Sequence, residues 1–179
     1  HLARITDEEV LETISENKEK VPEKKSKSGI IVKGLYDVAV HFSKCCSPVP
    51  GDEIVGFVTR GRGVSIHRTD CINIINLSDM ERERLIDAEW QHDEESGSSG
   101  LYLAEIKVFC NNRTGLLVDI TRAFTERAID INAIHSKTSK QGIATIDISF
   151  NTKGKAELTS VIDKLRQIDS IIDIERTTG

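Results

Sequence analysis

Two kinds of hydrophobic spacing alternate through residues 101–179, and this pattern limits the folds that the chain can adopt. Apolar residues at every second position from Ala104 to Cys110, and again from Ala144 to Phe150, predict strands that bury one face. Apolar residues at helical spacing from Leu116 to Phe124 predict a helix that begins after the loop 111–115. We therefore expect a sheet covered by helices.

The rest of this segment adds two strands and a second helix. Ile129 to Thr138 and Ile171 to Arg176 predict strands, and the spacing from Leu158 to Leu165 predicts a helix. The predicted order, βαββαβ, is typical of a ferredoxin-like antiparallel sheet with two helices on one face. The expected fold class is α+β.

The preceding segment has shorter strands. Runs of β-branched residues separated by turns predict strands at 30–32, 38–42, 53–59 and 64–67, with one more at 85–90. Arg60 to Gly63 predicts a tight hairpin between the third and fourth of these strands, and Thr69 can begin a short helix to about Asn76. A module of this size has a marginal core unless a metal or a neighbouring domain supports it.

Composition suggests how the chain is divided. Residues 1–28 contain a capping box at Thr6 and then a stretch without apolar residues, so we expect the end of a helical linker and a flexible segment. Residues 91–100 are acidic and then rich in Ser and Gly, which predicts a flexible linker. It separates a β-rich cysteine domain, residues 29–90, from the domain at 101–179.

The net charge of −5 comes mainly from residues 77–100, which hold two basic and eight acidic residues. The two domains are therefore close to neutral, and charge alone neither indicates nor excludes a nucleic-acid partner. No apolar run approaches the roughly 18 residues that a membrane helix needs, so we expect no membrane partner. The chain begins with His1, and we expect a fragment of a longer protein; its thiol usage favours the cytoplasm.

Three of the four cysteines lie between residues 45 and 71, with the spacing of a candidate zinc site. Cys45 and Cys46 would supply one pair of ligands, and His67 and Cys71 the other, since tetrahedral zinc is held by thiolates and imidazoles. Adjacent residues of a strand point to opposite faces, so both thiols can reach one ion only if the chain bends there. His41 is a substitute ligand.

Two other interpretations of these residues remain open. The thiols can be small buried side chains that pack a tight β-module, with His67 making ordinary hydrogen bonds. A catalytic thiol activated by His67 is the other, but nothing supplies an orienting third group or an oxyanion device, so we predict no catalytic residue.

Basic residues surround the same window. Lys44, Arg60, Arg62 and Arg68 lie on turns and at the ends of elements. A small positive patch without a reading helix suits contact with the phosphate backbone of structured RNA rather than sequence readout. Solvated surface arginines are the alternative.

The run from Cys45 to Cys71, CCSPVPGDEIVGFVTRGRGVSIHRTDC, resembles the C-terminal regulatory half of the Rel/SpoT family, the (p)ppGpp synthetase/hydrolase enzymes (GTP pyrophosphokinases) of the bacterial stringent response. The resemblance continues through Leu85 to Trp90 and into Asn112 to Leu117, and it covers about residues 30–179. It implies a conserved-cysteine domain, also called a zinc-finger or ribosome-intersubunit domain, followed by an ACT domain.

In this family the regulatory half contacts ribosomal RNA when uncharged tRNA occupies the ribosome, and it controls distant catalytic domains. The resemblance implies that Cys45, Cys46, His67 and Cys71 take the family's Cys/His positions and that the four basic residues contact RNA. The synthetase and hydrolase residues are absent, so the fragment is expected to be no enzyme.

ACT domains often bind amino acids at a dimer interface through the loop after the first strand. The resemblance therefore implies a site, for instance for a branched-chain amino acid, at Asn111, Asn112, Arg113, Gly115 and Leu116, and a homodimer through this domain. Thr114 stands where Pro is common in such loops, which leaves amino-acid binding open. The alternative function is a metal-based or thiol-based redox sensor that its ACT domain merely dimerises.

Overall fold

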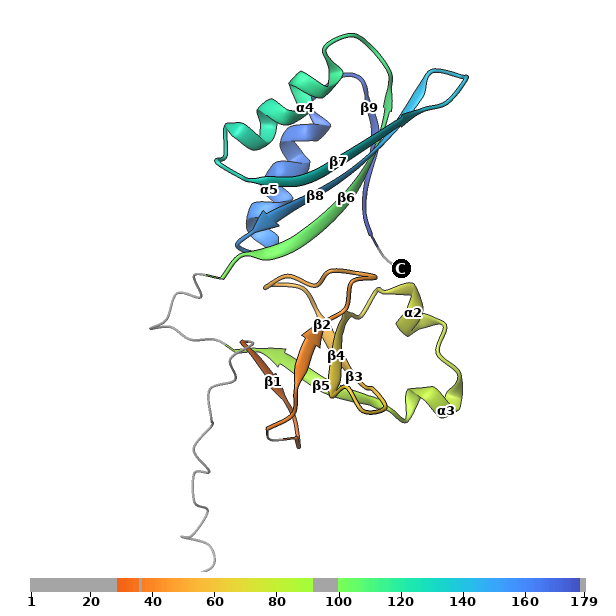
Figure 1. Ribbon diagram of the computed structural model, residues 1–179, viewed down its shortest axis with the longest axis vertical. Coiled ribbons are helices and arrows are strands. Elements are labelled where there is room, and N and C mark those ends of the chain that lie inside the picture. Colours follow the sequence, from red (N-terminus) through yellow and green to blue (C-terminus); the bar gives the residue numbers. More distant parts are fainter. Residues whose placement is uncertain (1–28, 36, 92–99, 178–179) are drawn as a thin grey trace, which may run out of the picture.

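The computed structural model describes residues 29–35, 37–91 and 100–177, which form a five-stranded and a four-stranded β-sheet, each with two helices (Figure 1). We call residues 29–91 the cysteine module and residues 100–177 the C-terminal domain. The helix expected after Thr6, and the linkers expected within 1–28 and 92–99, lie outside the described residues.

The C-terminal domain confirms the predicted βαββαβ order. Its elements are β6 (Tyr102–Asn111), α4 (Leu116–Thr125), β7 (Ile131–Thr138), β8 (Ile143–Thr152), α5 (Lys155–Arg166) and β9 (Ile171–Arg176). The four strands lie in the order β7-β8-β6-β9, and each neighbouring pair is antiparallel. Both helices cover the same face of this sheet (Figure 1).

The core of this domain follows from the alternation in its strands. Ala104, Ile106, Val108 and Cys110 of β6 are buried, as are the alternate residues of β8 that face the helices. Phe124 of α4 meets Phe150 of β8 edge to face, with ring centroids 5.0 Å apart.

The cysteine module is a five-stranded sheet with two short helices. Its elements are β1 (Ile30–Val32), β2 (Val40–Phe42), β3 (Ile54–Val58), β4 (Val64–Arg68), α2 (Ile72–Ile75), α3 (Asp79–Arg82) and β5 (Leu85–Trp90). The strand order is β1-β5-β3-β4-β2. The predicted β3–β4 hairpin is confirmed, whereas β2 lies parallel to β4, a pairing that the sequence did not predict.

A glycine sets the geometry of the β3–β4 hairpin. Gly63 has φ of +78°, and a Cβ at this position would lie 2.0 Å from the carbonyl oxygen of Ala39. The same carbonyl accepts a hydrogen bond of 2.8 Å from the amide of Val64. Only glycine permits this close approach, which holds the hairpin tip, with Arg60 and Arg62, beside the segment that leads into β2.

The two sheets contact each other through side chains of both. Phe42 and Trp90 of the cysteine module stack with their centroids 5.7 Å apart, and Tyr102 of the C-terminal domain meets both rings edge to face. Val49, from the loop after β2, is fully buried within the core of the C-terminal domain. The cysteine module, whose own hydrophobic core is small, is thus supported by packing against the C-terminal domain. Within the described residues, no helix is both long and apolar enough to cross a membrane.

Candidate functional site

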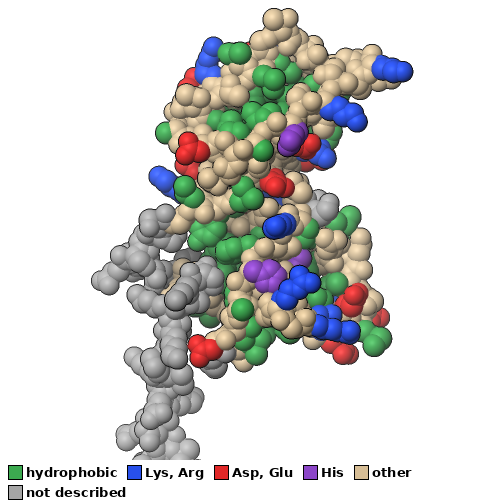
Figure 2. Space-filling model, in the orientation of Figure 1, with side chains coloured by type: hydrophobic (Ala, Val, Ile, Leu, Met, Phe, Trp, Pro, Cys, Tyr) green, Lys and Arg blue, Asp and Glu red, His purple; other side chains and the backbone are tan. Residues whose placement is uncertain are grey.

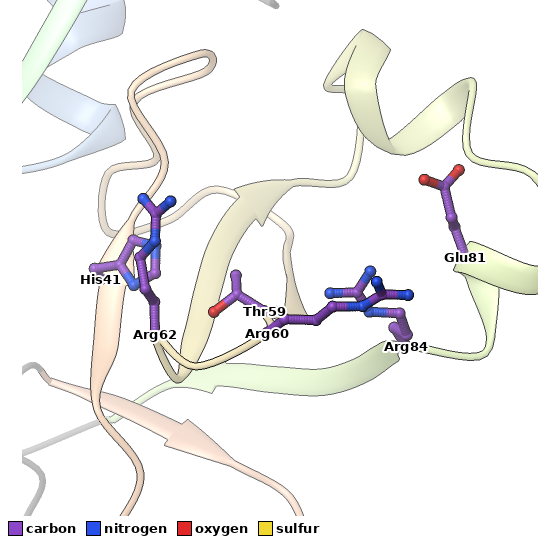
Figure 3. Close-up of a pocket in the computed structure, with 6 residues that line it drawn as sticks. All are labelled: His41, Thr59, Arg60, Arg62, Glu81 and Arg84. Atoms are coloured by element: carbon purple, nitrogen blue, oxygen red, sulfur yellow. The ribbon is translucent and has the colours of Figure 1, made fainter.

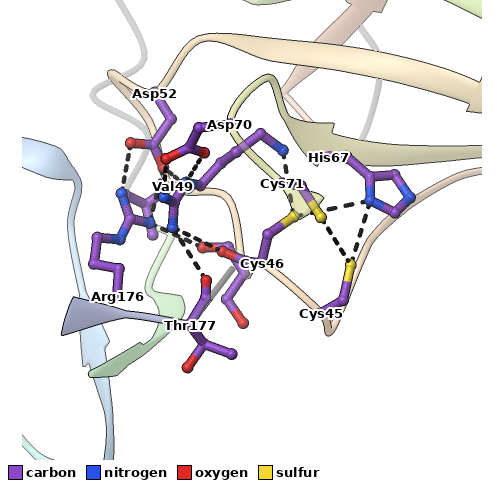
Figure 4. A network of polar contacts seen from close by, with 11 residues as sticks. Cys45, Cys46, Val49, Asp52, His67, Asp70, Cys71, Arg176 and Thr177 are labelled. Carbon is purple, nitrogen blue, oxygen red and sulfur yellow. Dashed lines mark hydrogen bonds and ion pairs between the residues drawn. The ribbon is translucent and has the colours of Figure 1, made fainter. Parts of the chain in front are cut away.

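The four predicted ligand residues converge on one point. The thiols of Cys45, Cys46 and Cys71 and a ring nitrogen of His67 all lie within 4.8 Å of one another. Cys45 Sγ is 3.4 Å from both His67 Nδ1 and Cys71 Sγ, and Cys46 Sγ is 3.9 Å from His67 Nδ1 (Figure 4). We call these four residues the Cys/His cluster.

A turn lets the adjacent thiols of Cys45 and Cys46 face the same point, which is the bend that binding one ion requires. The amide of Ser47 donates a 3.0 Å hydrogen bond to the carbonyl of Ser43, and Ser47 has φ of 43°. The chain therefore bends at Cys45 and Cys46 instead of continuing as a strand. Cys71 directly precedes α2, and its carbonyl accepts from the amides of Ile74 and Ile75, which fixes its backbone.

His67 is oriented by its second nitrogen. Its Nε2 lies 3.1 Å from the hydroxyl of Ser65, two residues earlier on β4. A hydrogen bond at this position holds the ring so that Nδ1 faces the thiols, which is the usual arrangement of a ligating histidine. Ser65 was not singled out in the sequence, where nothing distinguishes it from any serine of a strand.

The protonation of the cluster follows from burial and hydrogen bonding. Burial opposes ionisation of Cys45, but hydrogen bonds with Ser43, Asn73 and Cys71 outweigh it and lower the pKa of this thiol. Burial raises the pKa of Cys46 to about 12 and also raises that of Cys71. Burial lowers the pKa of His67, which favours the neutral ring that a metal requires.

This donor set fits a metal ion. Ligands about 2.0–2.3 Å from a tetrahedral centre stand roughly 3.3–3.8 Å apart. Three separations in the Cys/His cluster, 3.4, 3.4 and 3.9 Å, are close to this spacing, and all four atoms lie within 4.8 Å of one another. Three sulfurs and one imidazole nitrogen favour soft or borderline metals such as zinc. The amide of Arg68 also donates to Cys46 Sγ at 3.3 Å, a contact that stabilises a thiolate.

A hollow of about 550 Å³ lies on the cysteine module, lined by His41, Thr59, Arg60, Arg62, Glu81 and Arg84 (Figure 3). We call it the arginine hollow. Figure 2 shows basic side chains beside a histidine on one face of the module. The guanidinium carbon of Arg84 lies 4.4 Å from the ring centroid of Phe57, and its Nε donates to the carbonyl of Val58 at 3.0 Å. Arg84 is therefore held in place before any ligand arrives.

The four predicted basic residues do not share one surface. Arg60 and Arg62 line the arginine hollow, whereas Lys44 is exposed on the turn beside Cys45. Arg68 is buried, forms an ion pair with Asp70 and turns its guanidinium toward the C-terminal domain. The expectation that Arg68 contacts RNA is therefore wrong, because its guanidinium is buried and bonded within the protein.

Three residues that line the arginine hollow were not expected there. His41, the substitute metal ligand, lines the arginine hollow and lies outside the Cys/His cluster. Arg84 and Glu81 also line the hollow, although the sequence did not single them out. Glu81 and Arg84 lie 21 and 24 residues after Arg60 in the sequence. Only the β3–β5 pairing, which places Phe57 opposite Leu85, brings Arg84 to the hollow.

Comparison with known proteins agrees with this architecture. Residues 30–91 match the RelA/SpoT RIS domain, and residues 98–176 match an ACT domain. The GTP pyrophosphokinase of Escherichia coli strain K12 is 38% identical over 167 residues, covering 92% of this chain and 22% of that protein. That of Streptomyces coelicolor is 38% identical over 151 residues, covering 84% and 17%. The chain belongs to the RelA/SpoT family.

The chain spans about a fifth of the length of these relatives. The RIS and ACT matches together account for most of the chain, so this is a regulatory region of a RelA/SpoT protein. The solved ACT domain of the GTP pyrophosphokinase of Chlorobium tepidum is 27% identical and covers 43% of this chain and 99% of that one, with a TM-score of 0.39. From here the cysteine module is called the RIS domain, and the C-terminal domain the ACT domain.

The expected amino-acid loop of the ACT domain is fixed by its own contacts. The amide of Asn112, just past Asn111 at the end of β6, donates to Gly142 at 2.9 Å. Arg113 donates to the hydroxyl of Ser170 at 2.5 Å and to the carboxylate of Asp119 at 2.6 Å. Gly115 has φ of 79° and begins α4, whose first residue, Leu116, is buried.

Proposed function

We propose that this chain is the part of a stringent-response (p)ppGpp synthetase/hydrolase that binds ribosomal RNA in the cytoplasm and passes the signal of uncharged tRNA to the catalytic domains of the same protein. We take residues 29–90 and 101–179 as its two domains. The observation that carries the proposal is the arginine hollow on the RIS domain, where three arginines and a histidine surround an open space.

The chemistry of the arginine hollow suits phosphate. Arg60 and Arg62 are exposed at the hairpin tip, where they can reach an anion, and Arg84 is already ordered against Phe57. An ordered guanidinium loses less entropy on binding, and its planar fork matches phosphate oxygens. Contacts of this kind position an RNA backbone without reading its bases.

The test is the salt dependence of ribosome binding. Arg60→Ala and Arg62→Ala together should remove two phosphate contacts and weaken ribosome binding. The negative slope of the logarithm of the binding constant against the logarithm of salt concentration should become less steep by about 1.5. The matched control removes two exposed cations of the ACT helices, Arg122→Ala and Lys164→Ala. If both double variants weaken binding equally, the effect is one of general charge and the arginine hollow is not the RNA surface.

We further propose that the Cys/His cluster holds a structural zinc ion. Three thiolates and an imidazole would close the coordination sphere and leave no open position for chemistry. Elemental analysis of protein purified without chelator should find about one zinc per chain. Cys71→Ala should lose it, whereas Cys110→Ala, which removes the buried thiol of the ACT sheet, should retain it. Equal metal content in both variants would refute the site.

A redox sensor remains the second candidate because Cys45 Sγ and Cys71 Sγ lie 3.4 Å apart. In that case mild peroxide should produce a Cys45–Cys71 disulfide, detected by mass spectrometry of the digested protein. A zinc site predicts instead that the thiols stay reduced while the metal is bound, because coordinated thiolates are shielded by the ion and by burial.

For the ACT domain we propose amino-acid binding at the loop 111–116 and a homodimer through this face. Leu117 and Val118 follow the loop with 44% and 58% of their surface exposed, which suits the side chain of a branched-chain amino acid. Calorimetric titration with valine, leucine and isoleucine should give heat, and sedimentation should show a dimer. A flat titration at millimolar ligand, in which even weak sites fill, would refute this site.

A further inference from the structure

One loop serves both the Cys/His cluster and the interface between the domains. The segment Cys45–Asp52 begins with two thiols of the cluster and continues into residues buried against the ACT domain. Val49 lies within the ACT core, and the carbonyl of Pro50 accepts a 2.8 Å hydrogen bond from the amide of Lys155 at the start of α5. We call this segment the docking loop.

An ion pair fixes the far end of the docking loop. Arg176 of β9 contacts both carboxylate oxygens of Asp52, at 2.7 and 2.9 Å, and donates to the carbonyl of Ser47 at 3.2 Å (Figure 4). The two side chains are only 15% and 5% exposed. Asp52 also accepts a hydrogen bond from the amide of Val49, so the carboxylate holds the loop closed on itself.

A second connection runs through Arg68, which follows the ligand His67. Its amide donates to Cys46 Sγ, and its guanidinium donates to the carbonyls of Cys46 and of Thr177, each at 3.3 Å. Thr177 directly follows β9. Arg68, whose amide contacts a thiol of the Cys/His cluster, therefore also contacts the ACT domain.

We propose that metal binding at the Cys/His cluster and docking of the ACT domain are thermodynamically coupled through the docking loop. The coupling rests on the proposed metal site. Four ligands held by one ion fix the turn at Cys45 and Cys46, and the same turn presents Ser47, Val49 and Asp52 to the ACT domain. When the ACT domain is already docked, this turn is ordered before the metal binds. Metal binding and docking therefore each lower the conformational-entropy cost of the other.

Linkage makes the coupling reciprocal, so it can be measured from either end. From the ACT side, Arg176→Ala removes the ion pair without touching a ligand and should weaken zinc affinity about tenfold, a coupling of ordinary size for two linked sites. The control is Arg166→Ala on α5, which removes an arginine bonded to Ile174 and Asp173 within the ACT domain and should leave zinc affinity unchanged.

From the cluster side, the wild-type protein provides its own reporters. The amide of Lys155 bonds to Pro50, so its hydrogen exchange, followed by NMR, measures docking directly. The indole N–H of Trp90, the only tryptophan, donates to the carbonyl of Asp52 at 2.9 Å, so its fluorescence reports the loop. Zinc should slow exchange at Lys155 about tenfold relative to the chelator-treated protein, as the same coupling requires.

The outcomes separate the coupling from the metal site. Zinc affinity is measured by competition with a chromophoric chelator, and exchange at Lys155 in the full chain. Weaker zinc binding in Arg176→Ala, together with zinc-dependent protection of Lys155, supports the coupling. Stoichiometric zinc with unchanged affinity in Arg176→Ala and zinc-independent exchange overturns the coupling alone. A chain that binds no zinc overturns the metal site and the coupling together. If Arg176→Ala does not fold, the wild-type exchange experiment decides.

Discussion

Val49→Ala is the substitution that most directly tests whether the two domains share a core. Val49 belongs to the RIS domain in sequence, yet it is fully buried among residues of the ACT domain. Its truncation removes two methyl groups, which costs about 1.6 kcal/mol in transfer free energy at ~0.8 kcal/mol per group. The cavity that remains raises the expected loss to about 2–3 kcal/mol.

The assay is thermal or urea unfolding, followed by the fluorescence of Trp90 and by far-ultraviolet circular dichroism. If the domains unfold together, a loss of this size lowers the melting temperature by about 4–12 °C, since about 2–4 °C per kcal/mol is typical of chains of this length. Both signals should move together, because Trp90 reports the RIS domain and circular dichroism reports both domains.

Met80→Ala is the control, because this methionine of α3 is 82% exposed. Exposed substitutions usually change stability by less than about 0.5 kcal/mol, and alanine is favoured in helices. Equal midpoints for Val49→Ala and Met80→Ala would refute the shared core.

Two further predictions concern the RIS domain. Ser65→Ala should weaken zinc binding by about 10-fold or more without unfolding the protein, because it removes the group that orients His67; unchanged affinity in a competition titration would show that the hydroxyl has no such role. Gly63→Ala should destabilise the protein by well over 1 kcal/mol in urea unfolding, since its Cβ would overlap the carbonyl of Ala39 at 2.0 Å. Gly61→Ala has a similar φ of +83° and open space around it, so it should cost only about 1 kcal/mol; similar losses for both would contradict the steric argument.

Regular periodicity explains how much of the fold the sequence could predict. The βαββαβ order of the ACT domain follows from local spacing, since each strand and helix has its own period. The Cys/His cluster could also be predicted as one candidate ligand set, because thiols and an imidazole lie at two turns. The sequence did not distinguish metal ligation from the packing of buried thiols. The hairpin of Arg60 and Arg62 carries its own glycines, so the position of these residues at a tip was accessible too.

The sequence contains no comparable pattern that predicts the contacts between the two domains. Asp52 and Arg176 are 124 residues apart, and an acidic residue in a Pro-Gly turn is typical of solvent exposure. Val49 lies in a loop, where one apolar residue follows no period. Arg68 follows a candidate ligand and was expected at the surface, but the carbonyl of Thr177, which no local pattern places nearby, explains its burial. Tertiary contact decided these positions, and local preference did not.

The burial of Val49 within the ACT domain also bears on how such a protein can be rearranged. A boundary drawn at the linker assigns this valine to one domain, whereas the packing assigns it to the other. If an RIS domain were joined to an ACT domain from another protein, Val49 would meet a surface without the recess that now holds it. Asp52 would face no arginine in the position of Arg176. The two domains should therefore be inherited and exchanged as a pair, and compensating substitutions in relatives should link residues 47–52 to β9 and the start of α5.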